Sequence, residues 1–171
     1  MATLTATALI IFIIEAQIPL PIAIPGAKLG LANAVTLFAL FYGSGDGSSS
    51  GSRKNANLRT VDAFMVLICR IILGAVFTAR FTAFIYSLAG GLLAFAAQAV
   101  MKKILTNKQI WACGAVGAVF HNIGQITSAA IITRTPAIAA YLPLLTIAGI
   151  ITGVVTGLIA QFTLARISAW K

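Results

Sequence analysis

The sequence predicts an all-α membrane protein in which six transmembrane helices form one compact bundle. Of its 171 residues, 60% are hydrophobic and only 9% are charged, and the mean hydropathy is +1.01. This composition leaves too little polar surface to cover a soluble globule of that size. Because a bilayer core about 30 Å thick needs roughly 20 apolar residues per helix, the length allows about six spans in a single domain.

Six apolar runs follow one another along the chain. The first has no basic leader and no cleavable small-residue site, so we expect it to remain as a span. After the second run, residues 43–60 begin with a Gly/Ser-rich stretch that predicts a flexible cytoplasmic loop, to which we assign no function. The predicted spans are Leu4–Pro19, Leu29–Tyr42, Val61–Ala79, Phe81–Met101, Gln109–Thr133 and Ala137–Ala165.

The basic residues predict how the bundle is oriented. A net charge of +9 would suggest nucleic acid as a partner of a soluble protein, but these residues stand beside apolar runs, so we expect no nucleic-acid partner. With a cytoplasmic amino terminus, eight lie inside and three outside, which follows the positive-inside rule and places both termini in the cytoplasm. Outside are Lys28 and two arginines, Arg80 and Arg134, for which contact with lipid headgroups is the commoner explanation. The eight inside are Arg53, Lys54, Arg59, Lys102, Lys103, Lys108, Arg166 and Lys171.

Three polar side chains lie at membrane depth in the fifth run: His121, Asn122 and Gln125. Such groups are expensive in lipid, so we expect them to face the protein interior or a water-filled cavity and to mark a site. His121 and Gln125 are four residues apart and share one helical face. The alternative is that these side chains only tie neighbouring helices together, as polar groups often do in membrane bundles.

The segment between the first two runs cannot be one continuous helix, because it contains Pro19, Pro21 and Pro25. It must therefore bend at or near the membrane, and short segments interrupted by Pro or Gly often mark the binding site of a transporter. Lys28 and the backbone amides near it are candidates for holding an anionic group of a ligand. Equally, Lys28 could be an interfacial lysine whose ammonium group reaches the water.

Arg70 lies near the middle of the third run, where an arginine needs a carboxylate, a carbonyl or a ligand anion to offset its burial. Glu15 is the only carboxylate away from the cytoplasmic connection. Two interpretations therefore stand side by side for Arg70, a structural pair with Glu15 and a direct role in binding a ligand.

Small residues recur where helices are expected to touch. Gly149, Gly153 and Gly157 form two overlapping GxxxG units in the last run, which predict close packing inside the bundle. Ala2 and Ala6 have the same spacing at the start of the first run. These alanines are candidates for docking a partner protein.

The sequence argues against an enzyme and against a metal or cofactor site. Its only acids are Glu15, Asp46 and Asp62, which are scattered and exclude an acid-rich magnesium diphosphate site. There is no phosphate-binding loop of the form GxxxxGKS or GxxxxGKT, so the chain does not hydrolyse ATP by that route. Cys69 and Cys113 lie inside apolar runs without the spacing of metal ligands.

Four motifs follow one another along the chain: PGAKLGLAN at 25–33, YSLAGG at 86–91, HNIGQ at 121–125, and TP at 135–136 followed by YLP at 141–143. Together they resemble the Gx transporter family of bacterial membrane proteins, which often carries the label heptaprenyl diphosphate synthase component I. The likeness covers nearly the whole chain outside the Gly/Ser-rich stretch. That family looks like the substrate-binding S-components of energy-coupling factor (ECF) transporters, six-helix proteins that capture vitamins and work with a shared transmembrane subunit and two ATPases.

The resemblance implies a bacterial cell-membrane protein that binds a small vitamin-like solute, polar or anionic, in an outward-facing pocket. Lys28 and Asn33 would supply contacts on the lid side of this pocket, and Arg70 would contribute charge. The floor of the pocket would be lined by His121, Asn122 and Gln125. Ala2 and Ala6 would meet the ECF transmembrane subunit, whose ATPases would supply the energy.

Two other functions stay open. One is a non-catalytic membrane accessory of heptaprenyl diphosphate synthase, because prenyl transfer itself needs the acid-rich magnesium site that this sequence lacks. The other is a stand-alone proton-coupled carrier, in which Glu15 and His121 would take up the protons.

Overall fold

The computed structural model describes residues 2–17, 31–42, 52–78 and 81–169, and all regular structure within these ranges is helical. The predicted all-α class is therefore confirmed for the described residues. Two short 3₁₀ segments, η1 (Asn107–Gln109) and η2 (Pro136–Tyr141), precede the last two helices. The α-helices are α1 (Ala2–Gln17), α2 (Asn33–Phe41), α3 (Ser52–Thr78), α4 (Phe81–Ile104), α5 (Ile110–Thr133) and α6 (Leu142–Ala169).

Four helical segments in the described ranges are long and apolar enough to cross a membrane. α1 holds a shorter apolar stretch, Thr5–Glu15, and α2 has nine residues, which corresponds to about 14 Å. A helical membrane protein is thus confirmed, whereas the count of six spans and the cytoplasmic position of both termini stay predictions. The four segments are Thr60–Phe77, Phe81–Ile104, Ile110–Thr133 and Pro136–Ile167.

Three helix starts differ from the predicted spans by four residues or more, and one of them is α6, which begins at Leu142 rather than at Ala137, after η2. α2 begins at Asn33 rather than at Leu29, after a turn at Leu31 and Ala32. α3 begins at Ser52, so the end of the predicted flexible loop, residues 52–60, is helical. Five of these nine residues are Arg, Lys, Ala or Leu, which favour helices without adding an apolar face. Hydropathy alone therefore marked where the membrane run begins and not where the helix begins.

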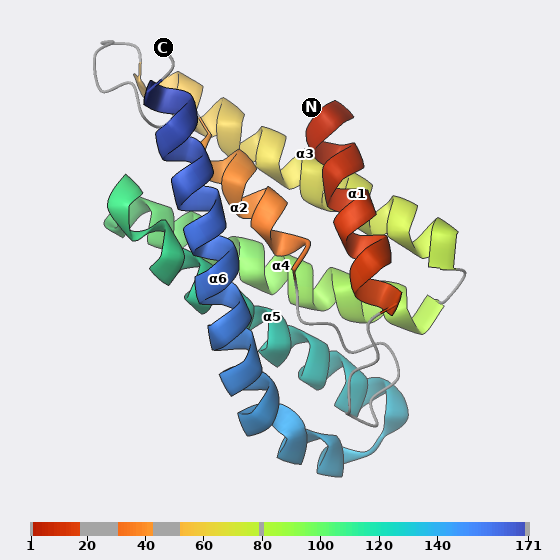
Figure 1. Cartoon of the computed structure of the whole chain (residues 1–171). Helices are drawn as coiled ribbons and strands as arrows, with labels where there is room; N and C mark the ends of the chain where they lie inside the picture. Colours follow the sequence, from red (N-terminus) through yellow and green to blue (C-terminus); the bar gives the residue numbers. More distant parts are fainter. Residues whose placement is uncertain (1, 18–30, 43–51, 79–80, 170–171) are drawn as a thin grey trace.

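The six helices pack as two groups that meet at α2 and where α3 packs on α4. In one group α5 lies between α4 and α6 and makes the most extensive interfaces of the bundle with both. In the other group α1 and α2 pack on α3. α2 contacts all five other helices and lies at the centre of the bundle, as Figure 1 shows. Seven of its nine residues are buried, which makes this short helix the core of the fold.

The last helix packs on α5 through its glycines, as the sequence predicted. A Cβ atom built on Gly153 would lie 2.6 Å from the carbonyl oxygen of Gly114 and 2.8 Å from the Cβ of Ala118. Gly149 and Gly157 face α5 in the same way. The backbones of α5 and α6 therefore touch directly, which is how small residues stabilise helix pairs in membranes.

α5 ends with a residue in the left-handed conformation. Arg134 has a φ of 51°, and its N–H donates to the carbonyl oxygen of Ile131. The N–H of Thr135 donates to the carbonyl oxygen of Ala130, 3.2 Å away. These two bonds form a Schellman motif, in which glycine usually takes the position that Arg134 holds here.

We expect Gly153→Ala to lower the free energy of unfolding by about 1–3 kcal/mol, because the added methyl group would force α5 and α6 apart. The matched control is Val155→Ile, which adds one carbon to an exposed side chain on the same helix and is expected to change little. Thermal unfolding of the detergent-purified variants measures both. Equal stability of the two variants would contradict direct backbone contact.

Candidate functional site

A buried polar cluster joins α1, α2 and α3 at the start of α2. It consists of Glu15, Asn33 and Arg70, whose side chains are 5%, 7% and 3% exposed. Arg70 Nη2 donates a hydrogen bond to Asn33 Oδ1 at 2.9 Å, and the backbone N–H of Ala32 donates to Glu15 Oε2 at 3.3 Å. Glu15 also lies close enough to Arg70 for their charges to attract.

This cluster places the carboxylate of Glu15 at the amino end of α2. The first N–H groups of a helix have no partner within the helix, and the helix dipole favours negative charge near them. Glu15 meets both needs from α1, while its charge offsets that of Arg70 in a region where either charge alone would be expensive. The charge of Glu15 therefore acts on Arg70, which fits the structural interpretation of the pair, and Asn33 is hydrogen-bonded to Arg70.

The other end of α2 is held by a cation from α4. Lys102 Nζ donates to the carbonyl oxygen of Leu40 at 2.6 Å and lies 5.9 Å from the centre of the Phe41 ring. Positive charge is favoured at the carboxyl end of a helix, where the last carbonyl groups lack partners. From the sequence, Lys102 is expected only to help orient the bundle in the membrane. Its position at the end of an apolar run does not predict a contact with Leu40.

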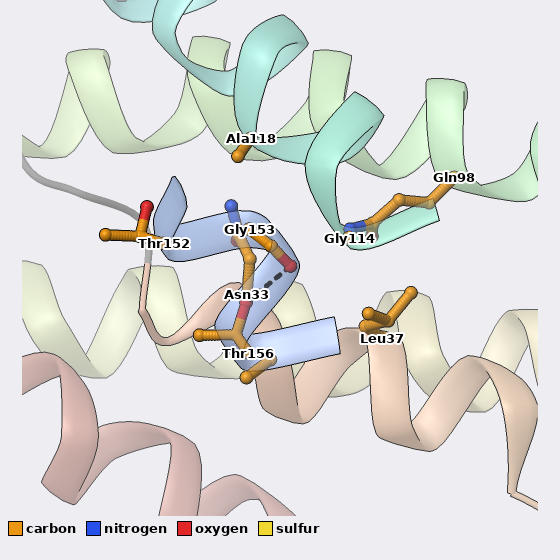
Figure 2. Close-up of a pocket in the computed structure, with 9 residues that line it drawn as sticks. Asn33, Leu37, Gln98, Gly114, Ala118, Thr152, Gly153 and Thr156 are labelled. Atoms are coloured by element: carbon orange, nitrogen blue, oxygen red, sulfur yellow. Dashed lines mark hydrogen bonds between the residues drawn. The ribbon is translucent and has the colours of Figure 1, made fainter. Parts of the chain in front are cut away.

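A small polar cavity lies beside Asn33, between α2 and the group formed by α4, α5 and α6. Its volume of about 10 Å³ is close to the room that one water molecule needs. Figure 2 shows α6 residues beside Asn33, with Gln98 and α5 residues across the cavity. The polar and glycine positions that line it are Asn33, Gln98, Gly114, Thr152, Gly153 and Thr156.

Gln98 was missed as a candidate, although it carries the signal that drew attention to His121. Its amide is a strongly hydrogen-bonding group in an apolar run, it is 2% exposed, and it lies against Gly117 of α5. Its backbone carbonyl oxygen also accepts a hydrogen bond from Cys113 Sγ at 3.6 Å. Applying the membrane-depth criterion to every span would have found it.

The three polar residues of α5 are all buried, with exposed fractions of 4% or less, but they face two different helices. Asn122 Nδ2 donates to the carbonyl oxygen of Leu145 on α6 at 2.5 Å. His121 and Gln125 share one face, as predicted, and this face contacts α4: a Cβ atom on Gly90 would lie 2.9 Å from His121 Nδ1 and from Gln125 Cγ. These contacts fit the alternative in which polar groups tie helices together.

The structure brings Arg70 and Asn33 together through a hydrogen bond, whereas the α5 residues contact α4 and α6. A Cβ atom built on Gly91 of α4 would lie 3.9 Å from Arg70 Nη2, and the neighbouring Gly90 faces His121. Among the lining residues of the cavity beside Asn33, none of the three predicted floor residues is present. Their role in binding a solute stays a prediction.

The remaining candidate residues from the sequence are Lys28, Ala2 and Ala6. Lys28 lies outside the described residues. Ala2 is the first residue of α1, and only its backbone is described. Ala6 is exposed on α1. Its exposure leaves it accessible to a partner, and that role also stays a prediction.

The fold and the buried cluster define a helical integral membrane protein whose polar groups converge on a central short helix. A family model described as heptaprenyl diphosphate synthase component I matches residues 4–48 and 54–163. The chain belongs to this family, which is the one its motifs resemble. No curated protein and no solved structure matches the chain. In the described ranges, no group of three His, Cys, Asp or Glu side chains is placed to hold a metal ion.

We expect Arg70→Met to lower the free energy of unfolding by about 3–5 kcal/mol, because it leaves the buried Glu15 carboxylate without its counter-charge. The double variant Glu15→Gln/Arg70→Met removes both charges and should be more stable than Arg70→Met alone. Denaturant titration in detergent micelles measures the three proteins. If the two substitutions simply add, Glu15 and Arg70 do not interact.

Proposed function

We propose that the protein is a non-catalytic, substrate-binding membrane subunit, similar to an S-component, of an ECF-type transporter. Its solute is small and vitamin-like, and carries a polar or anionic group. The observation that carries this proposal is a pair of unused donors: Arg70 Nε and Asn33 Nδ2 are buried and have no hydrogen-bond partner among the described residues. Unused donors inside a membrane protein are costly, and a ligand that accepts from them removes that cost.

The donors set the chemistry of the ligand. Arg70 and the amide nitrogen of Asn33 can only donate, so they fit an acceptor such as a carboxylate, a carbonyl or a phosphate oxygen. Lys28, from the segment that precedes α2, would add positive charge on the lid side. His121, Asn122 and Gln125 complete the proposed set as its floor.

Transport needs energy that this chain does not supply by itself. In the proposal, the exposed face of α1 that carries Ala6, with Ala2 one turn before it, docks on an ECF transmembrane subunit. The associated ATPases then drive the loaded protein through its cycle in the bacterial cell membrane. Both termini are cytoplasmic in this arrangement.

A second candidate function is a non-catalytic accessory of heptaprenyl diphosphate synthase, and the description of the matching family favours it. In that role, the bundle would anchor a soluble prenyltransferase at the membrane that its lipid product enters. The three acids of the whole sequence are too few and too scattered for the chain to perform prenyl transfer itself.

Ligand retention tests the first proposal. Small molecules extracted from the detergent-purified protein are measured by mass spectrometry, and we expect one solute to remain with the wild type. Asn33→Ala should retain about tenfold less, which corresponds to the loss of one hydrogen bond worth about 1.4 kcal/mol. Thr163→Val, a substitution at an exposed position of α6, is the control and should retain the solute fully. A wild type without solute, or equal retention by all three proteins, would contradict the proposal.

Partners distinguish the two functions. Affinity purification from native membranes should recover an ECF transmembrane subunit with its ATPases under the first proposal. Recovery of a soluble prenyltransferase would favour the accessory function. An Ala6→Leu variant, which places a bulky side chain on the exposed face of α1, should lose the ECF partner and keep its bound solute.

A further inference from the structure

We propose that the cavity between α2 and α6 binds one water molecule, which hydrogen-bonds Asn33 to Thr152 and Thr156. This water site shares Asn33 Nδ2 with the proposed solute site, and its test at Thr152 does not depend on the transport function. It would link the group of α1, α2 and α3 to the group of α4, α5 and α6 at the point where α2 meets α6.

The direction of the Asn33 amide follows from its partner. A guanidinium group only donates, so the oxygen of the Asn33 amide must face Arg70, as the 2.9 Å bond from Arg70 Nη2 requires. The NH₂ group then points away from Arg70. Asn33 is 7% exposed, it lines the cavity, and Nδ2 has no partner among the described residues. The cavity therefore contains one buried donor that needs an acceptor.

Acceptors stand on the α6 side of the same cavity. The Thr152 hydroxyl donates to the carbonyl oxygens of Ala148 and Gly149, at 3.0 and 3.1 Å. The Thr156 hydroxyl donates to the carbonyl oxygen of Gly153 at 3.2 Å, a bond visible in Figure 2. Because both protons are used within α6, the hydroxyl oxygens of these two cavity-lining residues keep lone pairs that can accept a hydrogen bond.

The size of the cavity selects its occupant. Gly114 and Gly153 line the cavity where the backbones of α5 and α6 touch, so these helices leave only a small space beside Asn33. About 10 Å³ suits a single water and nothing larger. A water that accepts from Asn33 and donates to Thr152 and Thr156 makes three hydrogen bonds, the usual number for a buried water.

Ions fit the same space poorly. No charged side chain lines the cavity. An anion would find only one clearly directed donor, the Asn33 amide. A hard cation such as Ca²⁺ takes six or more oxygen ligands, whereas this cavity presents only two hydroxyls and the Gln98 amide, next to the Asn33 NH₂ group that repels a cation.

Two isosteric substitutions on one helix test the water. Thr152→Val keeps the shape of the side chain and removes an acceptor, so we expect the melting temperature to fall by about 3 °C. Thr163→Val removes an exposed hydroxyl that makes the same kind of bond within α6, at 2.7 Å to the carbonyl oxygen of Ile159, and should shift the melting temperature by less than about 1 °C. Equal shifts would overturn the proposal.

A double-mutant cycle between Asn33 and Thr152 gives a second test of the water. Because no direct bond joins Asn33 to Thr152, the effect of Thr152→Val should disappear in an Asn33→Ala background if a water links them.

An experimental density map at high resolution should show one peak within hydrogen-bond distance of Asn33 Nδ2. Additive effects of the two substitutions, or a peak too large for a water, would overturn the water site.

Discussion

The fold depends on one constraint: a nine-residue helix lies in the centre of the bundle, and its ends must be satisfied without bulk water. Glu15 from α1 accepts from the amino end of α2, and Lys102 from α4 donates to its carboxyl end. Each charge has the sign that the helix dipole favours at that end. Two helices that are distant in sequence are thereby tied to the same short segment.

The position of the candidate site follows from this arrangement. Since α2 begins at Asn33, the first side chain of the helix is placed to bind Arg70 and to line the cavity toward α6. The negative charge of Glu15 acts on Arg70, so the cluster carries charges of both signs before any ligand arrives. A ligand at this cluster would therefore gain mainly from hydrogen bonds to unused donors, with Lys28 as the proposed source of further positive charge.

The sequence predicted the features that depend only on whether a residue is buried. An all-helical membrane bundle, close packing at Gly153 and the burial of His121 all follow from the high cost of polar or mismatched surface in lipid. It could not predict which neighbour each buried side chain meets. His121 and Asn122 are adjacent in sequence, yet they face α4 and α6. The contact of Lys102 with Leu40 spans 62 residues, and no local pattern encodes it.

The central claim is that charged side chains from other helices hold α2 in place. Hydrogen exchange of the α2 amides, followed by mass spectrometry, tests it most directly with Lys102→Met and, as the matched control, the exposed neighbour Lys103→Met. We predict that Lys102→Met speeds exchange in α2 by about tenfold, as the loss of a charge-assisted hydrogen bond worth about 1.5 kcal/mol requires, and leaves α5 unchanged. Equal exchange of α2 in the two variants would contradict the account.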